Sequence, residues 1–84
     1  MPLLAISQER TVTGTVISAN DNSGLPGVNV LLKGTATGTI TDIDGKFKVA
    51  VSGNDAVLVF TFVGFKNTEV LVGNQSEITV RLEE

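Results

Sequence analysis

The chain has 84 residues, 42% of them hydrophobic, and a net charge of −3, which suits one small folded domain. It contains no histidine and no cysteine, so a Ser-His-Asp triad, a cysteine nucleophile, a disulfide and an ordinary zinc site are excluded within it. Its six basic residues are outnumbered by nine acidic ones, and it has no Tyr or Trp to stack on a base, so we expect no nucleic-acid binding.

Residues 1–9 are predicted to be a disordered tail, and residues 10–84 a single folded domain. The apolar start, residues 1–8, is too short for a signal peptide and has no basic region before it. Ala5 and Ser7 are small residues at the two positions that a signal peptidase reads, so the tail is either the remnant of a signal peptide or an arbitrary terminus. No apolar run approaches the roughly 20 residues that span a bilayer, so direct membrane insertion is not expected.

From Thr11 onward the pattern predicts β-strands. Residues 11–18 alternate, with Val12, Gly14 and Val16 on one face. The breaker-rich residues 19–27 predict a loop. The strand that follows, residues 28–33, directs its valines and Leu32 toward the core.

The stretch 38–47 predicts a strand, a tight turn and the start of another strand. Asp42 and Asp44 can cap the turn with their own side chains, and Gly45 supplies a positive φ at little cost. Phe47 then opens a run, residues 47–51, that alternates as a half-buried strand does.

The second half continues in the same way. Residues 56–62 are the most apolar segment and predict a central strand covered on both faces. Gly64 predicts a bend or bulge before a strand at residues 65–72, and residues 76–82 alternate as the last strand. About seven short strands without a helical window predict an all-β fold: a seven-stranded antiparallel β-sandwich with Greek-key connections.

Several segments together resemble the carboxypeptidase-regulatory-like domain, in the version found at the N-terminus of starch-utilisation-type TonB-dependent outer-membrane transporters. The resemblance covers about residues 10–82. It rests on the order and spacing of segments, none diagnostic alone: Thr11–Val16, Leu25–Val30, Lys33–Thr35, Gly38–Thr39, Thr41–Phe47, Leu58–Lys66 and Glu69–Val70. Phe65 stands where Tyr is commoner in such domains, a conservative departure.

The resemblance implies a prealbumin or immunoglobulin-like sandwich without catalytic activity. It implies a periplasmic accessory or interaction domain of an outer-membrane nutrient (glycan) transporter, with partners in the plug and barrel of the parent chain and in other periplasmic or envelope proteins. Similar domains occur in exported metallocarboxypeptidases and cell-surface proteins, so a structural accessory role there is the alternative. The isolated domain is expected to be a monomer.

Asp42 and Asp44 are also the weak candidates for a metal site, because Asp-x-Asp-Gly can begin a calcium loop. Counted from Asp42, however, the fifth position is Lys46 and the twelfth is Gly53, where such a loop needs oxygen ligands. A calcium- or carbohydrate-binding module is therefore the third reading, and a structural turn is favoured. No catalytic residue, metal or cofactor is predicted.

The residues expected to shape turns and core are Asp42, Asp44, Gly45, Phe47, Phe60, Phe62, Gly64 and Phe65. The loops at residues 20–24 and 34–38, or an exposed strand edge, are the candidate partner surfaces. The sequence does not identify which strand lies at an edge.

Overall fold

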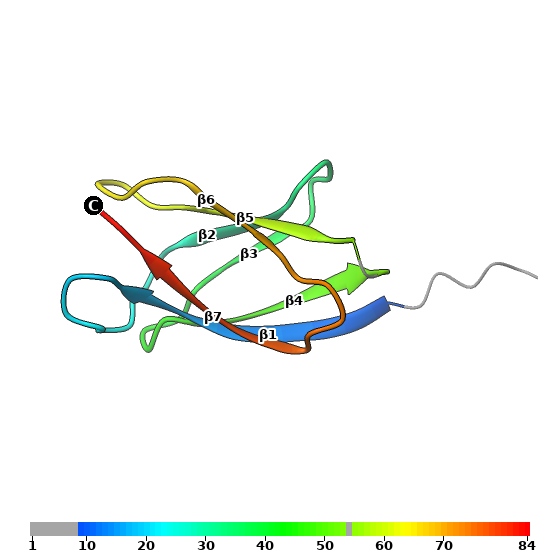
Figure 1. Cartoon of the computed structure of the whole chain (residues 1–84), viewed down its shortest axis with the longest axis horizontal. Coiled ribbons are helices and arrows are strands. Elements are labelled where there is room, and N and C mark those ends of the chain that lie inside the picture. Colours follow the sequence, from blue (N-terminus) through cyan, green and yellow to red (C-terminus); the bar gives the residue numbers. More distant parts are fainter. Residues whose placement is uncertain (1–8, 54) are drawn as a thin grey trace, which may run out of the picture.

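A computed structural model describes residues 9–53 and 55–84, and folds them into seven β-strands (Figure 1). In chain order the strands are β1 (Glu9–Ser18), β2 (Asn29–Leu32), β3 (Gly38–Ile40), β4 (Lys46–Ser52), β5 (Val57–Thr61), β6 (Thr68–Leu71) and β7 (Glu77–Leu82). The described residues include no helix long and apolar enough to cross a membrane.

The strands form two sheets that face each other as a sandwich (Figure 1). Sheet A has the strand order β4-β1-β7, and sheet B has the order β3-β2-β5-β6. The seven-stranded β-sandwich predicted from the sequence is confirmed. One detail differs, because β1 and β7 pair in parallel while all other pairs are antiparallel. The first and last strands run side by side in the same direction, since the chain crosses between the sheets before it returns.

Alternation along the strands builds the core. β4 buries every second residue and β7 does the same, so each presents one apolar row to the opposite sheet. Among the described residues, the core consists of 14 buried hydrophobic side chains: Val12, Val16, Val28, Val30, Phe47, Val49, Val51, Ala56, Leu58, Phe60, Val72, Ile78, Val80 and Leu82. It draws on both sheets and therefore makes the domain one packing unit.

The prediction that β5 is covered on both faces is wrong. β5 is central in its sheet, but only Leu58 and Phe60 are buried, while Val57, Val59 and Thr61 are half-exposed on the outer face. A continuously hydrophobic segment is typical of a strand that is buried on both faces. Within the part of the chain that the structure describes, however, no second layer covers the outer face of β5.

Two predicted boundaries also change. The strand predicted at residues 65–72 is shorter, because β6 is only Thr68–Leu71. Glu9, assigned to the tail from the sequence, is the first residue of β1. Residues 1–8 of the predicted tail lie outside the described residues, as does Asn54 of the turn expected after β4.

Candidate functional site

The turn between β3 and β4 is held by the carboxylate of Asp42. Its Oδ1 accepts hydrogen bonds from the backbone N–H groups of Asp44 and Lys46, both at 2.9 Å. The backbone closes the same turn, since the Asp42 N–H donates to the Lys46 carbonyl and the Gly45 N–H donates to the Asp42 carbonyl, each at 2.9 Å. Asp42 therefore works as an internal cap of the turn.

Gly45 fits this turn against β1 and the loop before β2. Its φ is +80°, and an added Cβ would lie 2.6 Å from the Val16 carbonyl oxygen and 2.7 Å from the Leu25 nitrogen. The Gly45 carbonyl accepts from the Val16 N–H at 2.7 Å, and the Val16 carbonyl accepts from the Leu25 N–H at 2.9 Å. Only glycine combines this conformation with this close approach.

Thr41, which no sequence pattern marks as a site residue, connects the same loop to β3. Its side chain is only 4% exposed. Its Oγ1 donates to the Leu25 carbonyl at 2.6 Å and accepts from the Val28 N–H at 2.9 Å. A threonine before the aspartates gave no pattern signal, because its role depends on residues 13 to 16 positions away in the chain.

The carboxylates of Asp42 and Asp44 have different surroundings. The Asp42 carboxylate is occupied by turn N–H groups, whereas the Asp44 side chain accepts no hydrogen bond among the described residues. Within residues 9–53 and 55–84, no group of three acidic side chains comes together. The geometry around Asp42 and Asp44 is that of a structural turn.

The four phenylalanines form two pairs. Phe47 of β4 and Phe60 of β5 are buried and meet edge to face, with ring centroids 5.5 Å apart, so they join the two sheets. Phe62 and Phe65 are partly buried and lie 5.6 Å apart. Gly64, with φ +87°, turns the chain between them, and the Phe65 N–H donates to the Phe62 carbonyl at 3.1 Å.

The loop predicted as a partner surface at residues 20–24 is tied down by its own polar groups. Asp21 Oδ1 accepts from the Ser23 hydroxyl at 2.8 Å and from the Ser23 N–H at 3.1 Å. These bonds hold the pKa of the Asp21 carboxyl below its usual value, with the hydroxyl as the main cause. Arg81 of β7 donates to the Asn22 side chain at 2.7 Å. The loop is thus a connected structure at one end of the sandwich.

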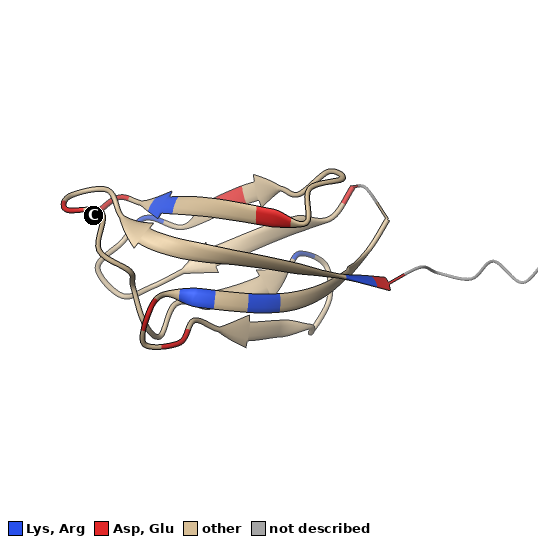
Figure 2. Cartoon of the chain, turned by 90° about the horizontal axis from the view of Figure 1, so that it is seen from below, with Lys and Arg blue, Asp and Glu red and all other residues tan. Residues whose placement is uncertain are grey.

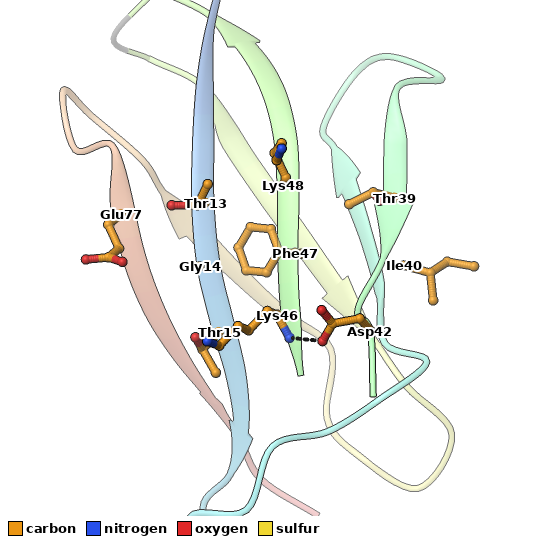
Figure 3. A pocket seen from close by; sticks show the side chains of 10 residues that line it. All are labelled: Thr13, Gly14, Thr15, Thr39, Ile40, Asp42, Lys46, Phe47, Lys48 and Glu77. Carbon is orange, nitrogen blue, oxygen red and sulfur yellow. Dashed lines mark hydrogen bonds between the residues drawn. The ribbon is translucent and has the colours of Figure 1, made fainter. Parts of the chain in front are cut away.

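A hollow of about 490 Å³ lies beside the β3 edge (Figure 3). It is lined by Thr13, Gly14, Thr15, Thr39, Ile40, Asp42, Lys46, Phe47, Lys48 and Glu77. Figure 3 shows Thr39 pointing toward the Phe47 side and Ile40 pointing away from it. Neither lysine forms an ion pair among the described residues, where Lys33–Glu69 is the only pair found.

The outer faces of the two sheets differ in polarity. On sheet A the strand register places Thr13 between Lys48 and Glu77, and Thr15 beside Lys46, so this face is polar; two basic residues follow one another along β4 (Figure 2). On sheet B, Leu31 lies opposite Val59.

A second hollow, of about 760 Å³, lies over this apolar face of sheet B. It is lined by Asn29, Val30, Leu31, Ala36, Gly38, Thr39, Ile40, Val59 and Thr61. Leu31 is 41% exposed and Ile40 is 61% exposed. Both side chains belong to the wall of this hollow and are exposed to solvent.

Known proteins resemble this chain over almost its whole length. The chain is 46% identical over 77 residues to TonB-dependent receptor P3 of Formosa agariphila, and 39% identical over 79 residues to TonB-dependent receptor SusC of Bacteroides thetaiotaomicron. Each match covers 92% of this chain but only 8% of the relative. The chain thus spans less than a tenth of the length of these receptors.

The fold also has a counterpart among solved structures. A chain in the crystal structure of a type II cohesin–X-dockerin complex from Acetivibrio cellulolyticus superposes with a TM-score of 0.65. That match is 19% identical and covers 84% of this chain and 51% of the other, so it supports the sandwich fold alone. A family model described as the CarboxypepD_reg-like domain matches residues 12–84. With the sandwich, the turn at Asp42 and the receptor relatives, this match shows that the chain belongs to the CarboxypepD_reg-like domain family.

Proposed function

We propose that this chain is a non-catalytic accessory domain at the N-terminus of a TonB-dependent outer-membrane nutrient transporter of the glycan-uptake type. The domain lies in the periplasm, attached to the plug and barrel of its parent chain, and contacts other envelope proteins there. One observation carries the proposal: nearly the whole chain matches less than a tenth of several TonB-dependent receptors.

The geometry is consistent with an attached interaction module. The core draws on both sheets, so the domain is a self-contained folding unit. Of the two acidic side chains that suggested a site, Asp42 caps the turn, while the most exposed apolar residues lie on the outer face of sheet B and at loop tips. A surface of this kind suits contact with another protein rather than chemistry on a small molecule.

A domain exchange in the SusC receptor of Bacteroides thetaiotaomicron tests the role. One strain lacks the receptor segment that matches this chain, and a second carries this chain in its place. We expect the deletion to slow growth on the nutrient that the receptor imports, and the exchange to restore it, with equal amounts of receptor in the outer membrane. A deletion strain that grows like the parent would contradict the accessory role.

Site-directed labelling tests the periplasmic location. The chain has no cysteine, and Val63 is 93% exposed, so Val63→Cys offers a unique reactive thiol in a receptor otherwise free of cysteine. We expect a membrane-impermeant maleimide to label it only after the outer membrane is made permeable. Buried Val72→Cys serves as the unreactive control. Labelling of Val63→Cys in intact cells would place the domain outside the periplasm.

A further inference from the structure

The free edge of β3 is defined by the hydrogen-bond pattern of its other edge. The Leu32 N–H donates to the Thr37 carbonyl at 2.9 Å, and the Thr41 N–H donates to the Val28 carbonyl at 3.0 Å. Thr39 lies opposite Val30 between these two contacts, so residues 37, 39 and 41 face β2. Gly38 and Ile40 therefore direct their N–H and C=O groups away from the sheet.

These groups are available because β3 is the outermost strand of sheet B in the described part of the chain. They supply two N–H donors and two C=O acceptors in a row, which is the pattern that an added strand recognises. The 490 Å³ and 760 Å³ hollows both include Thr39 and Ile40 in their walls. β3 thus borders both hollows, and on the side of sheet A it also approaches β4.

The other strand edges are less suited to pairing. On β4, the backbone N–H and C=O of Lys46 are both hydrogen-bonded to Asp42. The charged side chains of Lys46 and Lys48, at alternate positions of β4, disfavour the pairing of another strand along this edge. On β6, Glu69 is charged and paired with Lys33 at 3.0 Å. The residue after β7, Glu83, accepts a backbone hydrogen bond from a loop.

We propose that the β3 edge binds an extended segment of another protein, whose backbone pairs with Gly38 and Ile40 and whose side chains alternate between acidic and apolar. An added strand has two rows of side chains. One row lies in the hollow next to β4, which carries Lys46 and Lys48; neither lysine has an ion-pair partner among the described residues, so they favour carboxylates. Two acidic residues line the same hollow, but Asp42 is bound to turn N–H groups and Glu77 lies on β7, two strands away from β4. The other row continues the apolar face formed by Ile40 and Leu31.

A second copy of the chain fits this surface less well. At about 4.8 Å between strands and about 3.3 Å per residue, the outer face of sheet B offers a flat area of roughly 300 Å². A stable protein interface needs about 800 Å² on each partner. A single extended segment needs less area, because its backbone hydrogen bonds supply much of the affinity. Binding at the β3 edge would specify the chemistry of the partner in the proposed accessory role, and its biological meaning rests on that role.

Nuclear magnetic resonance titration of the 84-residue chain tests the proposal. The probe is a capped nine-residue peptide of alternating valine and glutamate. We expect the largest shifts at Gly38, Thr39 and Ile40, and slower amide exchange at Gly38 and Ile40. A peptide with the same composition but grouped valines should bind at least tenfold more weakly. No binding by the alternating peptide, equal binding by the grouped one, or shifts centred on β6 would overturn the proposal.

Ile40→Pro removes the backbone N–H donor of residue 40 from the free edge of β3 and leaves the hydrogen bonds between β3 and β2 in place. Leu71→Pro makes the same change at the free edge of β6 and serves as the matched control. Both side chains are 61% exposed, and both N–H groups face a free edge. We expect Ile40→Pro to weaken peptide binding at least tenfold, and Leu71→Pro to change it less than twofold. Ile40→Lys, which keeps the backbone donor, should give an intermediate loss and covers the case in which the proline variant does not fold. Equal effects at the two edges would overturn the proposal.

The salt dependence of peptide binding and the oligomeric state of the free chain also test the proposal. The double variant Lys46→Gln, Lys48→Gln should weaken binding several-fold and remove most of its salt dependence. Concentration-dependent dimerisation of the free chain through β3 would show that a second copy occupies the edge, and would overturn the proposal. In the receptor exchange, normal growth with Ile40→Pro would reject docking at β3 while leaving the accessory role in place.

Discussion

At Asp42 and Asp44, two neighbouring carboxylates have different structural roles. Asp42 Oδ1 accepts two backbone hydrogen bonds at 2.9 Å, whereas the Asp44 carboxylate accepts none among the described residues. Asp42→Ala should lower the free energy of unfolding by roughly 1–2 kcal/mol, because two turn N–H groups lose their acceptor. Asp44→Ala should stay within about 0.5 kcal/mol of the parent.

Urea unfolding of the two variants measures this difference. In a domain of this size, a loss of 1 kcal/mol lowers the melting temperature by roughly 4–8 °C, so thermal unfolding offers a second reading. Equal stability of the two variants would show that Asp42 does not hold the turn.

The pKa of Asp21 offers a test within a loop. The Ser23 hydroxyl and N–H stabilise the charged carboxylate, so its pKa is lowered when the chain is folded. The resulting stabilisation is present above the unfolded pKa of about 3.9, and is lost as the pH falls through the folded pKa.

Ser23→Ala removes the main cause of the shift and leaves the N–H. We expect it to raise the pKa of Asp21 toward its ordinary value, measured from the carboxyl ¹³C shift during acid titration. An unaltered Asp21 titration would rule out the hydroxyl as the cause.

At the scale of elements, alanine substitutions at Gly45 and Gly34 distinguish the energetic cost of a positive φ from the cost of a steric clash. Both have a positive φ, +80° and +84°, so alanine pays a left-handed cost of roughly 1–2 kcal/mol at either position. At Gly34 a Cβ would meet nothing within 4 Å, but at Gly45 it would press on backbone atoms of Val16 and Leu25. Gly45→Ala should therefore destabilise the domain clearly more than Gly34→Ala, as measured by urea unfolding. Equal losses would mean that β1 and the loop can move away from the turn.

Alternation predicted the buried faces of several elements from sequence alone. Val12 and Val16 in β1, and Ile78 and Val80 in β7, lie in the core as their spacing of two indicates. The parallel pairing of β1 with β7 was not predictable, because alternation says which face is buried and not which strand is the neighbour. Neighbours are fixed by contacts between distant parts of the chain.

The candidate turn was predictable, but its supports were not. Asp42 and Gly45 belong to a local pattern with known turn chemistry, and that pattern placed the turn correctly between two strands. Thr41 reaches the Leu25 carbonyl and the Val28 N–H, which only the folded chain brings near it. The prediction for the outer face of β5 was wrong for a related reason. The hydrophobicity of β5 resembles that of a strand covered on both faces, but whether a second layer covers it depends on the fold, and the described residues leave this face half-exposed.

For the whole molecule, the Phe47–Phe60 contact can be used to test whether the two sheets unfold together as one cooperative unit. Phe47 belongs to sheet A and Phe60 to sheet B, and their rings meet edge to face at 5.5 Å. Either Phe→Ala change should cost roughly 3–5 kcal/mol. A domain of this length has a total stability of about 4–13 kcal/mol, so the milder Phe→Leu changes suit a double-mutant cycle.

The cycle comprises Phe47→Leu, Phe60→Leu and both together, each unfolded in urea. We expect a coupling energy of about 0.5–1.5 kcal/mol, because the edge-to-face contact is lost once and not twice. Phe47→Leu with Leu71→Ala provides the control, since Leu71 is exposed on the outer face of sheet B, and this pair should be additive within about 0.5 kcal/mol. Intrinsic fluorescence is weak without Tyr or Trp, so far-UV circular dichroism follows strand content, and methyl resonances from each sheet report separately. Coincident transitions from both sheets with positive coupling would establish a single cooperative unit, whereas separate transitions would show that the sheets unfold independently.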